Sequence, residues 1–267
     1  MSSKKNRAKS SGHAQGSDKD SHPPDTKKDS SGRVHQRDKV SFHLNIRDLE
    51  WTDKQKKFID IALDKKTRLV FVKGPSGSSK SLISVYAALK LLNEKKISDI
   101  IYLRSAVESS ESSLGFLPGS ADEKLAFYNM PFLDKIDELL PQAEGKRLLT
   151  EGRAHCFPIN FVRGLNWNAK AVILDEAQNS SYKEIVTSLT RLGEFTRCFV
   201  LADPMQTDLK GPRGGGFMKF FDSFKDDPAA QAMGIHTFEF NNTDIKRSEL
   251  VAFLVDRIEK INNDKPN

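Results

Sequence analysis

The sequence has little cysteine, no long apolar run and no hydrophobic segment near its N-terminus. Its two cysteines, Cys156 and Cys198, cannot build a disulfide framework, and each lies in an apolar run that predicts a buried, reduced thiol. No stretch approaches the roughly 18 apolar residues that a membrane-spanning helix needs, and the polar N-terminus lacks a signal-peptide pattern. We therefore expect a cytoplasmic protein without a membrane segment.

Net positive charge is scarce outside the first 40 residues. The 267 residues carry a net charge of +6. Residues 1–40 contain ten Lys/Arg and five Asp, so about +5 of that net charge lies in this segment. That segment has almost no aliphatic residue, so it cannot bury enough apolar surface to offset the entropy of ordering. We expect a disordered basic tail over 1–40, which either contacts nucleic acid or is a solvated leader. One nearly neutral folded domain is expected over 41–267.

The folded part alternates helical and extended patterns. Helices are predicted at 52–63, 81–95, 121–127, 131–140, 181–191, 215–224 and 248–262, and strands at 68–73, 100–103, 154–157, 169–174, 198–202 and 235–240. Short apolar strands that alternate with helices are typical of a parallel sheet with both faces covered. The sequence predicts an α/β fold, with a parallel sheet sandwiched by helices.

A glycine-rich segment, GPSGSSKS at 74–81, follows the first predicted strand and opens the next helix. It matches the phosphate-binding pattern G-x-x-x-x-G-K-S/T except that Ser79 replaces the second glycine. A plain Gly/Ser turn would not explain a lysine at the start of a helix, where the helix dipole disfavours a cation. The candidate nucleotide-binding residues here are Gly74, Pro75, Ser76, Gly77, Ser78, Ser79, Lys80 and Ser81.

The chemistry of such a loop assigns a role to each polar residue. Backbone N–H groups cradle the phosphates, Lys80 reaches the β- and γ-phosphates, and Ser81 holds Mg²⁺. If the loop needs a positive φ at Ser79, the missing glycine costs roughly 1–2 kcal/mol, a strain that functional sites tolerate. Alternatively, the Ser79 hydroxyl contributes a contact to a phosphate oxygen.

Polar side chains also follow two later strands. The apolar run 171–174 leads into Asp175 and Glu176, which predicts a Mg²⁺-coordinating carboxylate beside the first strand's loop and a group that activates the attacking water. The alternative is a strand-end acid that caps the next helix. After strand 198–202, either Gln206 senses the γ-phosphate or Asp203 and Pro204 form a β-turn.

Gln55 lies about twenty residues before the glycine-rich loop and has two interpretations. At that distance its amide could read adenine. It also stands three residues after Thr52, in the spacing of a helix capping box. The two roles do not exclude each other.

These segments together resemble the PhoH-like family of phosphate-starvation-inducible ATPases, single RecA-like domains similar to the motor domain of superfamily 1 helicases. The resemblance covers roughly residues 50–262. It rests on GPSGSSKS at 74–81, RSAVE at 104–108 with LGFLPG at 114–119, FVRG at 161–164, VILDEAQN at 172–179, DPMQTDL at 203–209 and DIKR at 244–247.

The resemblance implies a P-loop NTPase that binds ATP with Mg²⁺. It places the Walker A roles on Lys80 and Ser81, the Walker B roles on Asp175 and Glu176, and γ-phosphate sensing on Gln206; Gln55 resembles the adenine-reading glutamine. The chain departs from the family pattern at Ser79, at Ala202 where glycine is commoner, and at Ser105 where proline is typical. These departures bear on turnover more than on binding.

Three functions are compatible with this pattern. The first is a Mg²⁺-ATPase that acts on RNA or another single-stranded nucleic acid, with Arg104, Arg163 and Arg213 either contacting its backbone or simply solvated. The second is a nucleotide-dependent regulatory switch with weak or no hydrolysis, which Ser79 favours. The third, a small-molecule kinase, shares the loop but is disfavoured by the Asp-Glu-Ala-Gln sequence at 175–178 and the lack of a recognisable lid.

Assembly is a further expectation from the resemblance. A superfamily 1 motor takes an arginine from a second RecA-like domain, and this chain has no length for one. We expect a homo-oligomeric ring, with a hexamer as the leading candidate, in which Arg247 reaches a neighbour's ATP site. The alternatives are a role for Arg247 within its own chain and an exposed charge beside the final helix.

Overall fold

The structure is a computed structural model that describes residues 43–105, 121–162, 164–207 and 216–245, together with residues 250, 253, 254 and 257. Side chains are described from residue 129 onward in the helix that begins at residue 121. The expected tail over 1–40, the loop at 108–119 and most of the expected helix over 248–262 lie outside these residues. No helix in the described ranges is long and apolar enough to cross a membrane.

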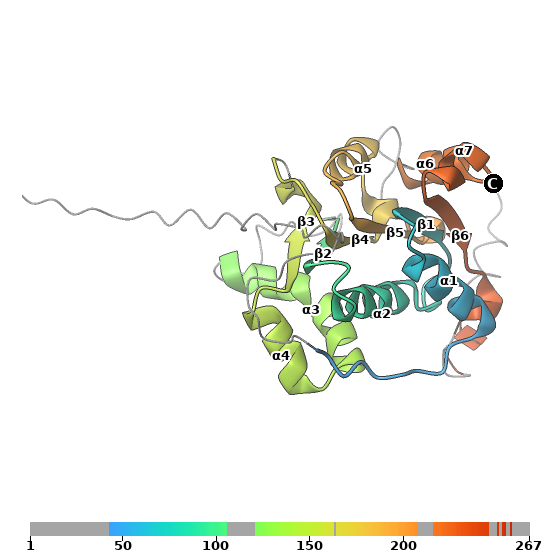
Figure 1. Ribbon diagram of the computed structural model, residues 1–267. Coiled ribbons are helices and arrows are strands. Elements are labelled where there is room, and N and C mark those ends of the chain that lie inside the picture. The colour runs from blue at the N-terminus through green and yellow to red at the C-terminus, as the bar shows by residue number, and fades with distance from the viewer. Residues whose placement is uncertain are drawn as a thin grey trace, which may run out of the picture.

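A six-stranded parallel sheet forms the centre of the fold (Figure 1). Its strands are β1 (Leu69–Lys73), β2 (Asp99–Arg104), β3 (Ala154–Pro158), β4 (Lys170–Asp175), β5 (Arg197–Ala202) and β6 (Ile235–Glu239). Their order across the sheet is β3-β2-β4-β5-β1-β6, and every neighbouring pair is parallel. The carboxyl ends of all strands therefore meet at one edge, where the loops after β1, β5 and β4 are neighbours.

Helices cover both faces of this sheet, with α1 to α4 on one face and α5 to α7 on the other (Figure 1). Their bounds are α1 (Asp53–Leu63), α2 (Lys80–Asn93), α3 (Ala121–Leu139), α4 (Gln142–Thr150), α5 (Tyr182–Leu189), α6 (Gly216–Phe224) and α7 (Pro228–Ala232). Alternate residues of β1 face the two layers: Val70 and Val72 join the α1–α4 core, whereas Leu69 and Phe71 join the core under α5 and α6. The predicted α/β class, with a parallel sheet sandwiched by helices, is confirmed.

The region 121–150 differs from the sequence prediction. The two helices expected at 121–127 and 131–140 are one helix, α3, which continues through Pro131. Phe132, Ile136 and Leu139 are buried against the sheet, and this packing offsets the hydrogen bond that Pro131 cannot donate. Helix α4 was missed because Gly145 disfavours helix.

The same glycine has a packing role that the sequence pattern does not reveal. A Cβ at Gly145 would lie 3.0 Å from Cγ2 of Ile136 on α3. A side chain at this position would require Ile136 to shift by a few tenths of an ångström, so the close approach of the two helices favours glycine.

Candidate functional site

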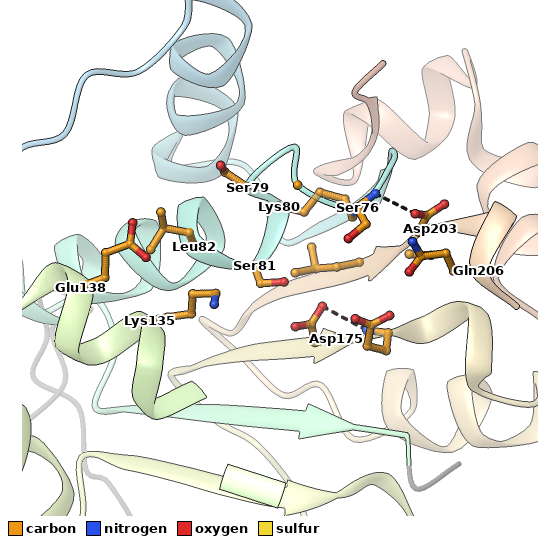
Figure 2. Close-up of a pocket in the computed structure, with 14 residues that line it drawn as sticks. Ser76, Ser79, Lys80, Ser81, Leu82, Lys135, Glu138, Asp175, Asp203 and Gln206 are labelled. Atoms are coloured by element: carbon orange, nitrogen blue, oxygen red, sulfur yellow. Dashed lines mark hydrogen bonds between the residues drawn. The ribbon is translucent and has the colours of Figure 1, made fainter. Parts of the chain in front are cut away.

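A cavity of about 340 Å³ opens at the carboxyl edge of the sheet, between β1, β5, β4 and helix α3 (Figure 2). Most of the residues singled out from the sequence line it, namely Ser76, Gly77, Ser79, Lys80, Ser81, Asp175, Glu176 and Gln206. Its size is typical of small-molecule sites. The segments after three different strands thus converge on one cavity, as the sequence predicted.

The glycine-rich loop after β1 has the geometry of a phosphate-binding turn. A Cβ at Gly74 would lie 2.7 Å from the Phe240 Cβ, so only glycine fits beside the segment that contains Phe240. Gly77 has φ 85° and Ser79 has φ 64° with ψ 19°. The position where the common pattern has glycine therefore adopts the left-handed conformation in this chain too. For serine, this left-handed backbone conformation costs roughly 1–2 kcal/mol.

Lys80, the first residue of α2, is held within the loop. Its side-chain Nζ donates to the carbonyl oxygens of Gly74 at 2.7 Å and Pro75 at 2.9 Å. Ser78 is fully buried, and its hydroxyl donates to the Pro75 carbonyl at 2.8 Å. Gly74, Pro75 and Ser78 therefore shape the loop, while Ser76, Gly77, Ser79, Lys80 and Ser81 face the cavity.

The turn after β4 holds Asp175 and Glu176. Asp175 is buried, and its two carboxylate oxygens accept from the Glu176 N–H at 3.0 Å and from the Tyr102 hydroxyl of β2. Burial, reinforced by the Asp175 carboxylate, raises the pKa of Tyr102 far above its usual range, so its hydroxyl stays protonated and donates. Glu176 itself is left-handed, with φ 53° and ψ 40°.

Gln178, which the sequence reading did not single out as a functional residue, joins this turn to β5. Its Nε2 donates to Oε2 of Glu176 at 2.5 Å, and its Oε1 accepts the Asp203 N–H at 3.0 Å. Oδ2 of Asp203 in turn accepts the Ser76 N–H of the phosphate loop at 2.7 Å (Figure 2). Strand β5 lies between β1 and β4, so Asp203 links the phosphate loop to the turn that holds Asp175 and Glu176.

The segment after β5 forms a turn and also lines the cavity. Asp203 caps the short 3₁₀ helix Pro204–Gln206, because its Oδ1 accepts the Met205 N–H at 3.1 Å. Asp203 and Gln206 also line the cavity. The segment therefore forms the turn and also places Gln206 at the cavity. That Gln206 senses the γ-phosphate stays a prediction.

Gln55 forms the predicted capping box and lies away from the cavity lining. Its Oε1 accepts the Thr52 N–H at 3.0 Å, and its own N–H donates to the Thr52 hydroxyl at 3.2 Å. The side chain is fully buried, and its Nε2 has no hydrogen-bond partner among the described residues. Adenine reading by Gln55 stays a prediction.

Arg163, Arg213 and Arg247 lie outside the described residues.

Two residues of α3 line the cavity although no sequence motif marked them. Lys135 and Glu138 lie on the far side of the cavity from Asp203 (Figure 2). In the sequence they read as charges on the solvated side of a helix. Their role becomes visible only once α3 is placed over the carboxyl edge of the sheet.

The residues present fit a nucleotide with a divalent cation. Glu138, Asp175, Glu176 and Asp203 outnumber the cavity's lysines, Lys80 and Lys135, so a polyphosphate needs an additional cation here. Mg²⁺ in such sites binds through one or two protein oxygens and the phosphates. The Ser81 hydroxyl and the Asp175 carboxylate line the same cavity and are the groups that would hold it.

Comparison with known proteins agrees with this geometry. A family model described as PhoH-like protein matches residues 49–259. The chain belongs to the PhoH-like family. The PhoH-like protein of Bacillus subtilis is 35% identical over 208 residues, an alignment that covers 76% of this chain and 61% of that protein. The family and the cavity together indicate a P-loop nucleotide-binding protein.

Other relatives show the same partial overlap. The PhoH-like protein of Mycobacterium tuberculosis is 34% identical over 76% of this chain and 55% of its own length, and protein PhoH of Escherichia coli is 34% identical over 68% and 51%. This chain thus spans between 51% and 61% of these PhoH-like relatives. A crystal structure of Bacteroides sp Pif1 in complex with ADP-AlF4 aligns with 78% of this chain and 45% of that one, at 15% identity and a TM-score of 0.35. That similarity is too low to support an argument about function.

Proposed function

We propose that this PhoH-like chain is a Mg²⁺-dependent ATPase. The observation that carries the proposal is the convergence of Lys80 and Ser81, at the start of α2, with Asp175 and Glu176, at the end of β4, on one cavity. The N-terminus of α2 adds positive potential to the backbone N–H groups of the loop. These are the components that phosphoryl transfer to water requires.

Each residue has a distinct task in the proposed reaction. Lys80 leaves its two loop carbonyls to contact the β- and γ-phosphates, and Ser81 and Asp175 hold the metal. Bound Mg²⁺ would neutralise charge on the β- and γ-oxygens. Glu176 orients the attacking water and accepts its proton, and Gln206 donates a hydrogen bond toward the γ-phosphate. Gln55 would read the adenine.

A specific observation supports a second candidate, a nucleotide-dependent switch with weak or no hydrolysis. Oε2 of Glu176 is already bonded to Gln178 at 2.5 Å, and Ser79 holds a left-handed conformation that favours glycine. A water-activating carboxylate that stays tied to a neighbouring amide would slow the proton transfer. Nucleotide binding could then change the loop without efficient turnover.

One assay separates the two candidates. Purified full-length protein is incubated with ATP and Mg²⁺, with and without single-stranded RNA, and phosphate release is measured. Catalytic turnover that disappears in excess EDTA supports the ATPase. Tight nucleotide binding by calorimetry without phosphate release supports the switch. Transfer of phosphate to an added small molecule in place of water would support the kinase interpretation.

RNA or another single-stranded nucleic acid is the proposed partner. Arg104 ends β2 at the same edge of the sheet as the cavity, and the tail carries most of the excess positive charge. Phosphate contacts of this kind weaken as salt rises. Stimulation of phosphate release by RNA that fades between low and physiological salt is therefore expected. A cytoplasmic location stays a prediction, supported by the two free cysteines.

A ring of identical chains is proposed to complete the site, with Arg247 of one chain acting on its neighbour's ATP. An arginine supplied in this way can contribute ~10³–10⁵ in rate, so specific activity should rise with protein concentration. Mixing an Arg247→Ala chain with a Glu176→Gln chain should partly restore activity, because some interfaces then pair the intact halves. A monomer by light scattering, with turnover independent of concentration, would assign Arg247 to its own chain.

A further inference from the structure

Helix α3 is fixed directly beside the Asp175 turn. The Phe132 ring stacks on Tyr102, with 4.8 Å between centroids and 25° between planes, and the Tyr102 hydroxyl donates to Asp175. Phe132, Ile136 and Leu139 are all buried. This stripe of α3 therefore sets the distance and rotation of the helix relative to the end of β4.

The rotation turns Lys135 toward the cavity. Lys135 precedes the buried Ile136, so its aliphatic stem lies along the edge of the packed stripe and is partly buried. Figure 2 shows the amine directed toward the space between Ser81 and Asp175, and the same residues line the cavity. Within the described part of the chain, the amine forms no hydrogen bond or ion pair.

The Lys135 amine faces the cavity and can pair there with an anion that enters it. Lys80 lies on the opposite wall, within the loop, and its amine is bonded to two carbonyls. Lys135 approaches from another element, on the side of Ser81 and Asp175. Cations on two walls can contact one polyphosphate from two sides, which a single lysine cannot do.

We propose that Lys135 contacts the terminal phosphate of a bound nucleoside triphosphate and so distinguishes triphosphate from diphosphate. The inference rests on the proposed nucleotide site and adds a residue outside its loop. It gives the chain a cation of its own at the position where charge develops during phosphoryl transfer. A triphosphate would be recognised from α3 even before any neighbouring chain contributes.

The test is a pair of binding measurements on the full chain. Calorimetry gives the affinity for ADP and for a slowly hydrolysed ATP analogue, both with Mg²⁺, in wild type and in Lys135→Ala. We expect the analogue to bind about tenfold more weakly to the variant, as for the loss of one charge-assisted hydrogen bond. ADP affinity should be unchanged. Lys135→Arg should retain most of the preference, because it keeps the charge.

Lys146→Ala is the matched control, because it removes an exposed lysine from the next helix, α4. It should leave both affinities unchanged. If Lys135→Ala does not fold, Lys135→Met keeps the aliphatic stem and decides the question. Equal affinities for the analogue in wild type and variant, or an equal loss for analogue and ADP, would overturn the role of Lys135. A wild type that binds neither nucleotide would instead overturn the proposed function.

Discussion

The phosphate loop after β1 and the turn after β4 each contain a left-handed residue other than glycine, but different contacts hold that residue in place. Each follows a buried strand, opens on the same cavity and places a residue other than glycine in the left-handed region: Ser79 with φ 64° and Glu176 with φ 53°. The turn after β4 is held by side chains, since Tyr102 bonds Asp175 and Gln178 bonds Glu176. Ser79 has no side-chain capping bond at the start of α2.

This difference indicates which turn is already organised. A strained conformation persists where the surrounding structure enforces it. Around Glu176, the hydrogen bonds from Tyr102 to Asp175 and from Gln178 to Glu176 provide that support. The phosphate loop is held by Lys80, Ser78 and Asp203, and their bonds described above go to Gly74, Pro75 and Ser76 and not to Ser79. We infer that the β4 turn is complete without ligand, whereas the phosphate loop gains its remaining bonds from an anion.

The largest effect expected is the loss of hydrolysis in Lys80→Ala. The substitution removes the cation from the loop, and with it several kcal/mol of charge stabilisation on the transferring phosphoryl group, or about 100-fold or more in rate. Phosphate release and the melting temperature are measured together, since the variant also loses two internal bonds. A folded variant with wild-type phosphate release would contradict the proposed reaction.

On the other turn, Glu176→Gln should separate turnover from binding. An amide can still bond Gln178 but cannot accept a proton, so turnover should fall by about 10²-fold or more. Nucleotide affinity by calorimetry should be unchanged. A parallel loss of affinity would show that Glu176 supports the structure of the turn instead of the chemistry.

Removing the hydrogen bonds of Gln178 to Glu176 and Asp203 should lower the free energy of unfolding. Gln178→Ala leaves the buried Asp203 N–H without its acceptor, and an unsatisfied buried group costs about 1–3 kcal/mol. The free energy of unfolding in urea measures the loss. Thr187→Ala is the control, because its hydroxyl bonds an exposed carbonyl of the same helix, that of Lys183. Equal effects of the two substitutions would mean that the network contributes little.

Ser79→Gly should have a smaller effect, of opposite sign. Relief of the left-handed strain, offset by the greater freedom of glycine when unfolded, should leave a gain of up to about 1 kcal/mol. Nucleotide affinity or activity should rise with it. Lys95→Gly is the control, since Lys95 is also left-handed, with φ 57°, but does not line the cavity. Lower activity in Ser79→Gly would instead assign the hydroxyl a phosphate contact.

Neither turn should depend on the N-terminal segment. Deleting residues 1–40 should leave the melting temperature and the basal phosphate release unchanged, because the described body begins its packing at Leu44, which is buried. Any affinity for RNA should fall and lose part of its salt dependence. Fluorescence anisotropy with labelled RNA at several salt concentrations measures this. A drop in melting temperature would show that the tail packs on the body.

The comparison also shows what local sequence can predict. The six strands and the glycine-rich turn were predicted, because apolar runs and the pattern at 74–81 are contiguous in the chain. A positive φ at Ser79 was considered as a condition because the usual pattern has glycine there, and the structure shows it. The left-handed Glu176 was not predicted, because nothing at 175–178 marks it, and its conformation depends on Gln178 and on Tyr102 from another strand.

Helix α3 shows a second limit. Two helices were predicted at 121–127 and 131–140, yet one helix continues through Pro131, because burial of Phe132 and Ile136 outweighs the lost hydrogen bond. The contribution of Lys135 and Glu138 to the cavity depends on how α3 crosses the sheet, which no local spacing encodes. The strand order, with β5 between β1 and β4, is likewise a property of the assembled sheet.

That strand order gives Asp203 a place in both turns. Its carboxylate accepts the Ser76 amide of the phosphate loop, and its own amide donates to Gln178 behind Glu176. Segments linked through one buried residue open together and not independently, as a cooperative unit. In hydrogen exchange, we expect the amides of Ser76 and Asp203 to share one protection factor, although 127 residues separate them in the chain. A nucleotide bound in the cavity would then slow exchange at both amides by the same factor.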